Sequence, residues 1–121
     1  MKIIVADDSL VMRKIISNLI KSMGFEYLLA VNGQEVLDLL GENYTDIDLI
    51  LLDWNMPVMD GMETIVAMQS QSNYKDIPIL MVSTESEDDC IDRAIRAGAK
   101  GYMAKPFTQE DLAAKIKKIL S

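Results

Sequence analysis

The chain has 121 residues, with 12 Lys and Arg against 19 Asp and Glu, which gives a formal net charge of −7. This acidic balance argues against nucleic acid as a partner, because sequence-independent affinity for nucleic acid comes from Lys and Arg that neutralise phosphates. The single cysteine excludes a disulfide within the chain, and no apolar run approaches the ~18 residues of a membrane-spanning helix, so we expect a cytoplasmic protein without membrane insertion.

Short apolar runs alternate along the chain with longer segments of helical period, a pattern typical of repeated βα units on a parallel sheet. The expected strands are Lys2–Ala6, Phe25–Ala30, Asp48–Asp53, Ile77–Val82 and Gly101–Ala104. The third and fourth contain the continuously apolar runs Leu49–Leu52 and Ile79–Val82, which indicate strands covered on both faces. We therefore expect an α/β fold, a doubly wound parallel sheet of five strands, formed by residues 1–121 as a single domain with no attached effector.

A predicted helix follows each of these strands. The first is the clearest, because apolar residues recur at three- and four-residue spacing between Ser9 and Gly24: Met12, Ile15, Ile16, Leu19, Ile20 and Met23. The later helices each have a start signal in which an acid follows the N-cap residue by three positions: Asn32 with Glu35, Asp60 with Glu63, Ser86 with Asp89 and Thr108 with Asp111.

Polar residues gather where the expected strands end. Asp7 and Asp8 follow the first strand, Asp53 ends the third, Ser83 and Thr84 follow the fourth, and Lys105 follows the fifth. In an open α/β sheet, ligands bind outside the carboxyl ends of the strands, so these residues are expected to share one site.

The acidic part of this expected site requires neutralisation. Two carboxylates ~4 Å apart repel by about 4 kcal/mol at an effective dielectric of 20. Histidine is absent from the chain, and with it the commonest zinc ligand and general base. An all-oxygen set suits Mg²⁺. We therefore expect Mg²⁺ at Asp7, Asp8 and Asp53, with Lys105 facing the same anion.

Together, these motifs resemble the receiver domain of bacterial response regulators over essentially the whole chain. The motifs are Asp7-Asp8, Asp53 in Leu52-Asp53-Trp54-Asn55-Met56-Pro57, Met59-Asp60-Gly61, Ser83, and Lys105-Pro106-Phe107. Trp54 directly after Asp53 resembles the single-domain chemotaxis regulators of that family. The resemblance implies the flavodoxin-like strand order 2-1-3-4-5.

The resemblance also implies a role for each site residue. Asp53 would accept a phosphoryl group from a phosphohistidine on a histidine kinase or histidine phosphotransfer domain. Mg²⁺ would bind to Asp8, Asp53 and the backbone carbonyl of Asn55, and to Asp7 through water. Lys105 would pair with the phosphoryl group, its amine aimed by a cis Lys105-Pro106 bond. Ser83 would donate its hydroxyl to a phosphoryl oxygen, with Thr84 as the open alternative. Asn55 and Glu85 would tune the rate of dephosphorylation.

A conformational switch is the implied outcome. Tyr102 would rotate from an exposed to a buried position and alter the surface of the fourth helix, fifth strand and fifth helix. Candidate contacts there are Ile91, Ile95, Tyr102 and Met103, with ordinary core packing as the alternative for Ile91 and Ile95. The expected target is a flagellar motor switch protein or another downstream protein, with a phosphatase as a further candidate partner. We expect a monomer that catalyses only its own phosphorylation and dephosphorylation.

Three other functions are alternatives to this one. A Mg²⁺-dependent phosphatase with an Asp nucleophile commonly has Asp two positions after that nucleophile, where this chain has Asn55. A flavodoxin-type electron carrier needs a hydroxyl-rich phosphate loop after the first strand, where this chain has Asp7-Asp8-Ser9. A stand-alone receiver that acts as a phosphorelay intermediate or phosphate sink, outside motor control, stays open.

Overall fold

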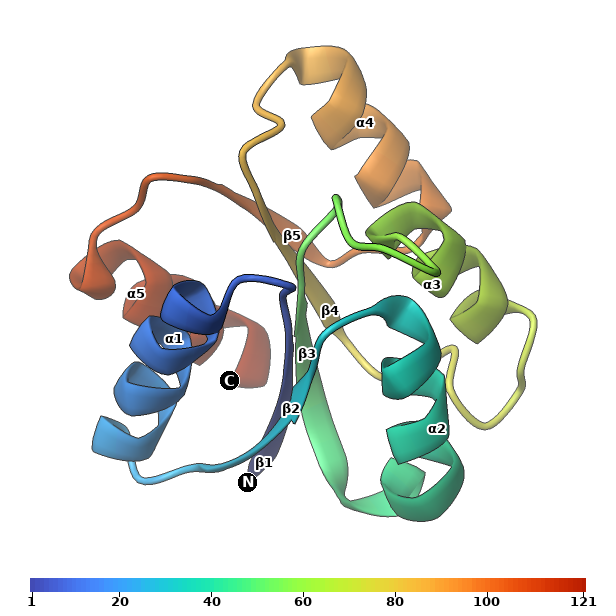
Figure 1. Cartoon of the computed structure of the whole chain (residues 1–121), viewed down its shortest axis with the longest axis horizontal. Helices are drawn as coiled ribbons and strands as arrows, with labels where there is room; N and C mark the ends of the chain where they lie inside the picture. Colours follow the sequence, from blue (N-terminus) through green and yellow to red (C-terminus); the bar gives the residue numbers. More distant parts are fainter.

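The computed structural model describes residues 1–121 and consists of a five-stranded parallel sheet flanked by α-helices (Figure 1). The strands are β1 (Lys2–Ala6), β2 (Glu26–Ala30), β3 (Ile47–Leu52), β4 (Ile79–Ser83) and β5 (Gly101–Ala104). The helices are α1 (Leu10–Ser22), α2 (Gly33–Asn43), α3 (Gly61–Gln69), α4 (Asp88–Ala97) and α5 (Gln109–Leu120), with a short 3₁₀ turn η1 (Tyr44–Asp46). The strand order β2-β1-β3-β4-β5 confirms the predicted doubly wound topology.

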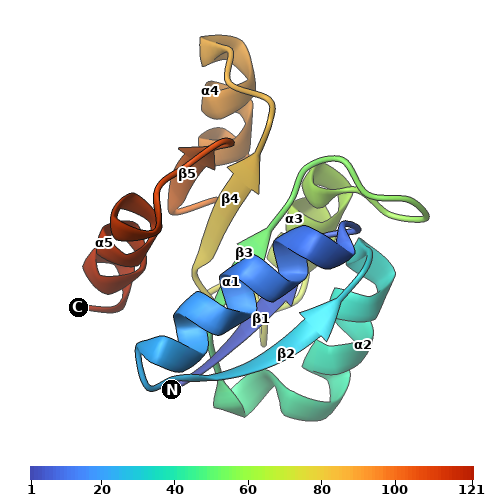
Figure 2. The same cartoon turned by 60° about the vertical axis from the view of Figure 1, so that its left-hand side comes forward.

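Helices cover both faces of the sheet (Figures 1 and 2). α1 and α5 lie on one face, over a core that includes Ile16 and Leu112. α2, α3 and α4 lie on the other face, over a core that includes Ile65. Every residue of β4 is buried, as expected for a continuously apolar strand between two helical layers. None of the helices is both long enough and apolar enough to cross a membrane.

Most of the predicted helix starts are confirmed. Side-chain oxygens of four N-cap residues accept from backbone N–H groups in the first turn of α1, α2, α3 and α5: Ser9, Asn32, Asp60 and Thr108. The prediction of Ser86 as the start of α4 is wrong, because the N-cap is Glu87 and its side chain makes no capping bond. Asp88 and Asp89 in the first turn suit the positive end of the helix dipole instead.

Three of the strands, β2, β3 and β4, differ from the prediction by one or two residues at an end, and the differences in β3 and β4 bear on the site. β4 begins at Ile79 and not at Ile77, because Pro78 has no N–H to give to a strand ladder. β4 also extends to Ser83, which pairs with Ala104 of β5. β3 ends at Leu52, so Asp53 lies just beyond the last residue of its strand.

Candidate functional site

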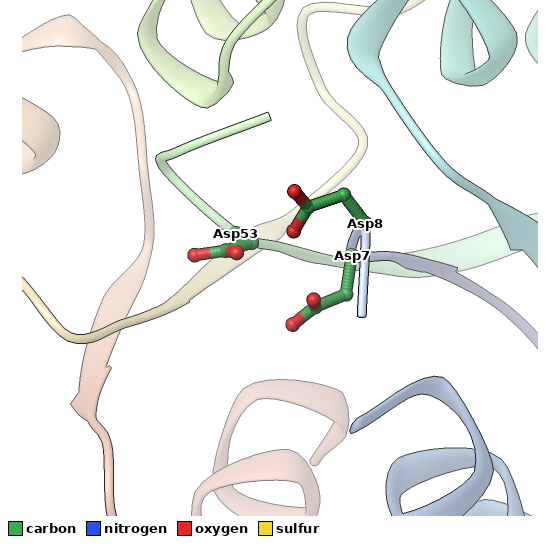
Figure 3. Close-up of side chains that lie close together, drawn as sticks. All are labelled: Asp7, Asp8 and Asp53. Carbon is green, nitrogen blue, oxygen red and sulfur yellow. The ribbon is translucent and has the colours of Figure 1, made fainter. Parts of the chain in front are cut away.

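The pairing of β1 with β3 brings the acidic residues together. Ala6 lies opposite Leu52, so the chain leaves both strands side by side at Asp7 and Asp53. The Asp53 N–H donates to the carbonyl of Ala6 at 2.9 Å. One carboxylate oxygen from each of Asp7, Asp8 and Asp53 lies within 4.8 Å of the others (Figure 3). The three residues that the sequence places at two strand ends therefore form one cluster.

Lys105 enters this cluster from the end of β5. Its Nζ lies 2.7 Å from Oδ2 of Asp7 and 3.5 Å from Oδ2 of Asp53. The Lys105 backbone N–H donates to the carbonyl of Ser83 at 2.8 Å, which fixes the start of the loop that carries the amine. The Lys105-Pro106 peptide bond is cis, as the family resemblance implies. Since one ammonium faces three carboxylates, the cluster keeps a net negative charge when all its groups are ionised.

Asp7 is the most firmly held of the acids. Its exposed fraction is 1%, and its Oδ1 accepts from the Ser9 N–H at 2.9 Å while Oδ2 accepts from Lys105. Arg13 Nη1 donates to the Asp7 carbonyl at 2.7 Å. The sequence analysis missed Arg13, although its position one helical turn after Ser9 places it above this loop. Asp8, by contrast, is exposed to solvent.

Burial and charge act together on Asp53, whose exposed fraction is only 7%. Burial raises the pKa of this carboxyl above its ordinary value, and the negative charge of Asp7 raises it further. The Lys105 ammonium and the Trp54 backbone N–H lower the pKa but do not reverse the shift. The ionised carboxylate of Asp53 is therefore less favourable in this site than it is in free solution.

Hydroxyl and amide groups border the cluster on the β4 side. Ser83 is fully buried, and its Oγ accepts from the Glu85 N–H at 3.2 Å, whereas Thr84 is exposed. Asn55 Nδ2 donates to Oε1 of Glu85 at 3.3 Å. This bond links the loop after β3 to the loop after β4 across the edge of the site.

Tyr102 occupies an inward position in this structure. Its exposed fraction is 8%, and its hydroxyl donates to the carbonyl of Glu85. Burial raises the pKa of the phenol above its ordinary value. Of its proposed surface companions, Met103 is mostly buried in the core on the α1 and α5 face and lines an open cavity between β5 and α5, while Ile91 packs partly against the other core and Ile95 is exposed.

The loop between β3 and α3 carries Asn55 and depends on close backbone contact at Gly61. The Gly61 N–H donates to the carbonyl of Trp54 at 2.8 Å. A Cβ atom at position 61 would lie 2.4 Å from the carbonyl oxygen of Asp53, so only glycine permits this approach. Gly61 thereby closes the loop against the same strand end that presents the Asp53 carboxylate.

The donor set is suited to a hard divalent cation. Mg²⁺ takes oxygen ligands, usually one or two carboxylates with water in the remaining positions. Asp8 and Asp53 supply carboxylate oxygens from within the cluster, and no His or Cys lies among them. A divalent cation would be the largest charge in this site and would offset the residual negative charge of the cluster.

Comparisons with known proteins agree with this geometry. The family model for the response regulator receiver domain matches residues 3–117, so the chain belongs to the response regulator receiver domain family. It is 40% identical over 121 residues to a chemotaxis protein CheY homolog of Campylobacter jejuni, covering 99% of this chain and 92% of that protein. It is also 40% identical over 120 residues to the chemotaxis protein CheY of Pseudomonas aeruginosa, covering 98% and 95%.

Solved structures place the chain in the same group. The structure of the chemotaxis response regulator CheY4 of Vibrio cholerae matches with a TM-score of 0.91 and 35% identity, over 98% of both chains. The chain is therefore a receiver domain similar to the CheY chemotaxis response regulators.

Proposed function

We propose that the chain is a signalling switch of a two-component system, activated when Asp53 accepts a phosphoryl group. An Asp53 carboxylate oxygen attacks phosphorus, the P–N bond to a phosphohistidine of a histidine kinase or phosphotransfer domain breaks, and the imidazole leaves with the bonding electron pair. The observation that best supports this proposal is the cluster of three carboxylates within 4.8 Å, with the Lys105 ammonium 3.5 Å from Asp53.

Phosphoryl transfer requires mainly positioning and neutralisation of charge on the phosphoryl oxygens. When bound, Mg²⁺ supplies part of that neutralisation, held by Asp8, Asp53 and the backbone carbonyl of Asn55, with Asp7 acting through water. Lys105 supplies the other part, because its amine already lies between Asp7 and Asp53. The firm contacts of Asp7 with Ser9 and Arg13 keep one wall of the site in place.

Ser83 is the hydroxyl best placed to respond to the phosphoryl group, because it is buried at the end of β4 and Thr84 is exposed. Its Oγ can donate to a phosphoryl oxygen and draw in the loop that contains Glu85. Since the Tyr102 hydroxyl bonds to the Glu85 carbonyl, movement of this loop changes the position that Tyr102 prefers. One covalent event thus biases two states of the surface formed by α4, β5 and α5.

The partner of this surface belongs, in our proposal, to chemotaxis, with a flagellar motor switch protein as the first candidate. Support comes from the relatives, which are named as chemotaxis proteins. Asn55 and Glu85, joined by a hydrogen bond at the edge of the site, are placed to orient the water that hydrolyses the acyl phosphate.

Intact-mass spectrometry tests the chemistry. We expect acetyl phosphate and Mg²⁺ to add one phosphoryl group to the wild-type protein, and EDTA to suppress the addition. Asp53→Ala should remain unmodified, while the matched control Asp76→Asn, an exposed acid outside the cluster, should be modified like the wild type. Absence of an adduct on the wild-type chain, or its persistence in Asp53→Ala, would overturn the proposal.

Capture experiments then test the partner. The chain labelled with beryllofluoride, which mimics the phosphoryl group, should bind a flagellar switch component more tightly than the untreated chain does. Tighter binding to a histidine phosphotransfer protein alone would instead assign the chain to a phosphorelay.

A further inference from the structure

α4 is the helix that the core holds least firmly. Ala94 is its only fully buried residue, and its N-cap residue Glu87 makes no side-chain capping bond. Cys90 and Ile91 are only partly buried against the core. A helix with so little buried surface depends on individual side-chain contacts for its position.

One such contact joins α4 to the residue that follows Asp53. The Arg93 guanidinium carbon lies 5.5 Å from the centroid of the Trp54 ring, within the range of a cation–π interaction. Asp89 lies four residues before Arg93, which is the spacing of a helical ion pair. Nevertheless, the only ion pairs of the structure are those of Lys105, so Arg93 is directed to the indole and not to its acidic neighbour.

Trp54 is well placed to connect this contact to the site. Its exposed fraction is 9%, it adjoins Asp53 in the chain, and its backbone N–H lowers the pKa of the Asp53 carboxyl. Its carbonyl accepts from Gly61, which fixes the loop around the indole. Arg93 makes no ion pair with an acid of the cluster, and its contact is with the Trp54 ring, so it reaches the site through Trp54.

We propose that Arg93 is a positioning residue that couples the state of Asp53 to α4 through its contact with Trp54. The inference rests on the proposed function, because it concerns the path from the phosphoacceptor to the responding surface. α4 then has two links to the site: the bond from Tyr102 to the Glu85 carbonyl before its first turn, and the Arg93 contact in its second half. Removal of the second link leaves the far part of α4 joined to the site only by apolar packing, since Ala94 and Trp54 belong to the same core cluster.

Hydrogen exchange of the α4 amides, with and without Mg²⁺ and beryllofluoride, tests the inference. In the free protein, the amide hydrogens of α4 should exchange about two- to fivefold faster in Arg93→Gln than in the wild type. This ratio corresponds to the free energy of an exposed cation–π contact. The change that beryllofluoride produces at α4 in the wild type should shrink in Arg93→Gln, and Arg93→Lys should restore it in part because the cation is kept. Arg96→Gln, an exposed cation on the same helix, is the matched control and should behave like the wild type.

Acetyl phosphate labelling of Arg93→Gln separates this inference from the proposed function. Labelling at the wild-type level, with a reduced response of α4 and a changed Trp54 emission, supports coupling through Arg93. Normal labelling with an unchanged response of α4 overturns the coupling and leaves the proposed function intact. Loss of labelling in the wild-type protein itself would overturn both.

Discussion

Replacement of Asp53 by Asn is expected to stabilise the metal-free protein at neutral pH. At 4.8 Å, the upper limit of the separations in the cluster, and an effective dielectric of 20, the repulsions of Asp53 with Asp7 and Asp8 amount to about 3.5 kcal/mol each. The attraction to Lys105 at 3.5 Å amounts to about 5 kcal/mol, which leaves a net repulsion of about 2 kcal/mol. Solvent screening at the exposed Asp8 reduces this net repulsion, whereas burial of the Asp53 charge adds to the destabilisation of the wild type.

Thermal unfolding in EDTA at pH 7 measures the effect. A gain of about 2 kcal/mol corresponds to a rise in Tm of roughly 8 °C for a chain of this size. Asn has the shape of Asp, and Lys105 keeps its closer partner Asp7, so packing should be preserved. The reasoning is refuted if Asp53→Asn unfolds at a lower temperature than the wild type under these conditions.

The stability difference between Asp53→Asn and the wild type should depend on pH. Because the folded-state pKa of Asp53 is raised, the wild type is most stable, with respect to this group, below the unfolded-state pKa of about 3.9. That stability is lost as the pH rises through the raised pKa. The advantage of Asp53→Asn should therefore be absent in acid and should grow as the pH rises through the raised pKa of Asp53.

Three further changes follow from the same geometry. Mg²⁺ should alter the fluorescence of Trp54, the only tryptophan, and Asp53→Asn should weaken this response; an unchanged wild-type spectrum would count against the metal site. Val58 is 81% exposed and has a φ of 69°, a left-handed conformation that Asn adopts more readily than Val. Val58→Asn should therefore raise the free energy of unfolding by about 1 kcal/mol in chemical denaturation. The control Val66→Asn, in the regular helix α3, should give no gain. Gly61→Ala should lower stability by about 1–3 kcal/mol and reduce acetyl phosphate labelling, because the new methyl group displaces the Asp53 carbonyl; normal stability would show that the loop yields freely.

The fold could be predicted from the sequence because its main determinants are local. Continuous apolar runs identified the buried strands, and Ser9, Asn32, Asp60 and Thr108 identified helix starts through bonds made within one turn. The start of α4 was predicted one residue too early, at Ser86. The pattern assumes a side-chain capping bond, and neither Ser86 nor the observed N-cap residue Glu87 makes one.

The acidic site was also predictable, because residues at the carboxyl ends of adjacent parallel strands must meet whatever the detailed packing. The contacts that hold these residues were not. The approach of Arg93 to Trp54 depends on how α4 packs over the strand ends, and no sequence spacing encodes that packing. The bond from Arg13 to Asp7 spans only six residues, and the position of Arg13 one helical turn after Ser9 is the signal that could have indicated it.

Chemical mapping of the acceptor tests the central claim most directly. Borohydride reduces an aspartyl phosphate to homoserine, so the protein treated with acetyl phosphate and Mg²⁺ can be reduced, digested and sequenced by tandem mass spectrometry. Homoserine at position 53 is the predicted result. Homoserine at position 7 or 8 instead, or at no position, would contradict the account.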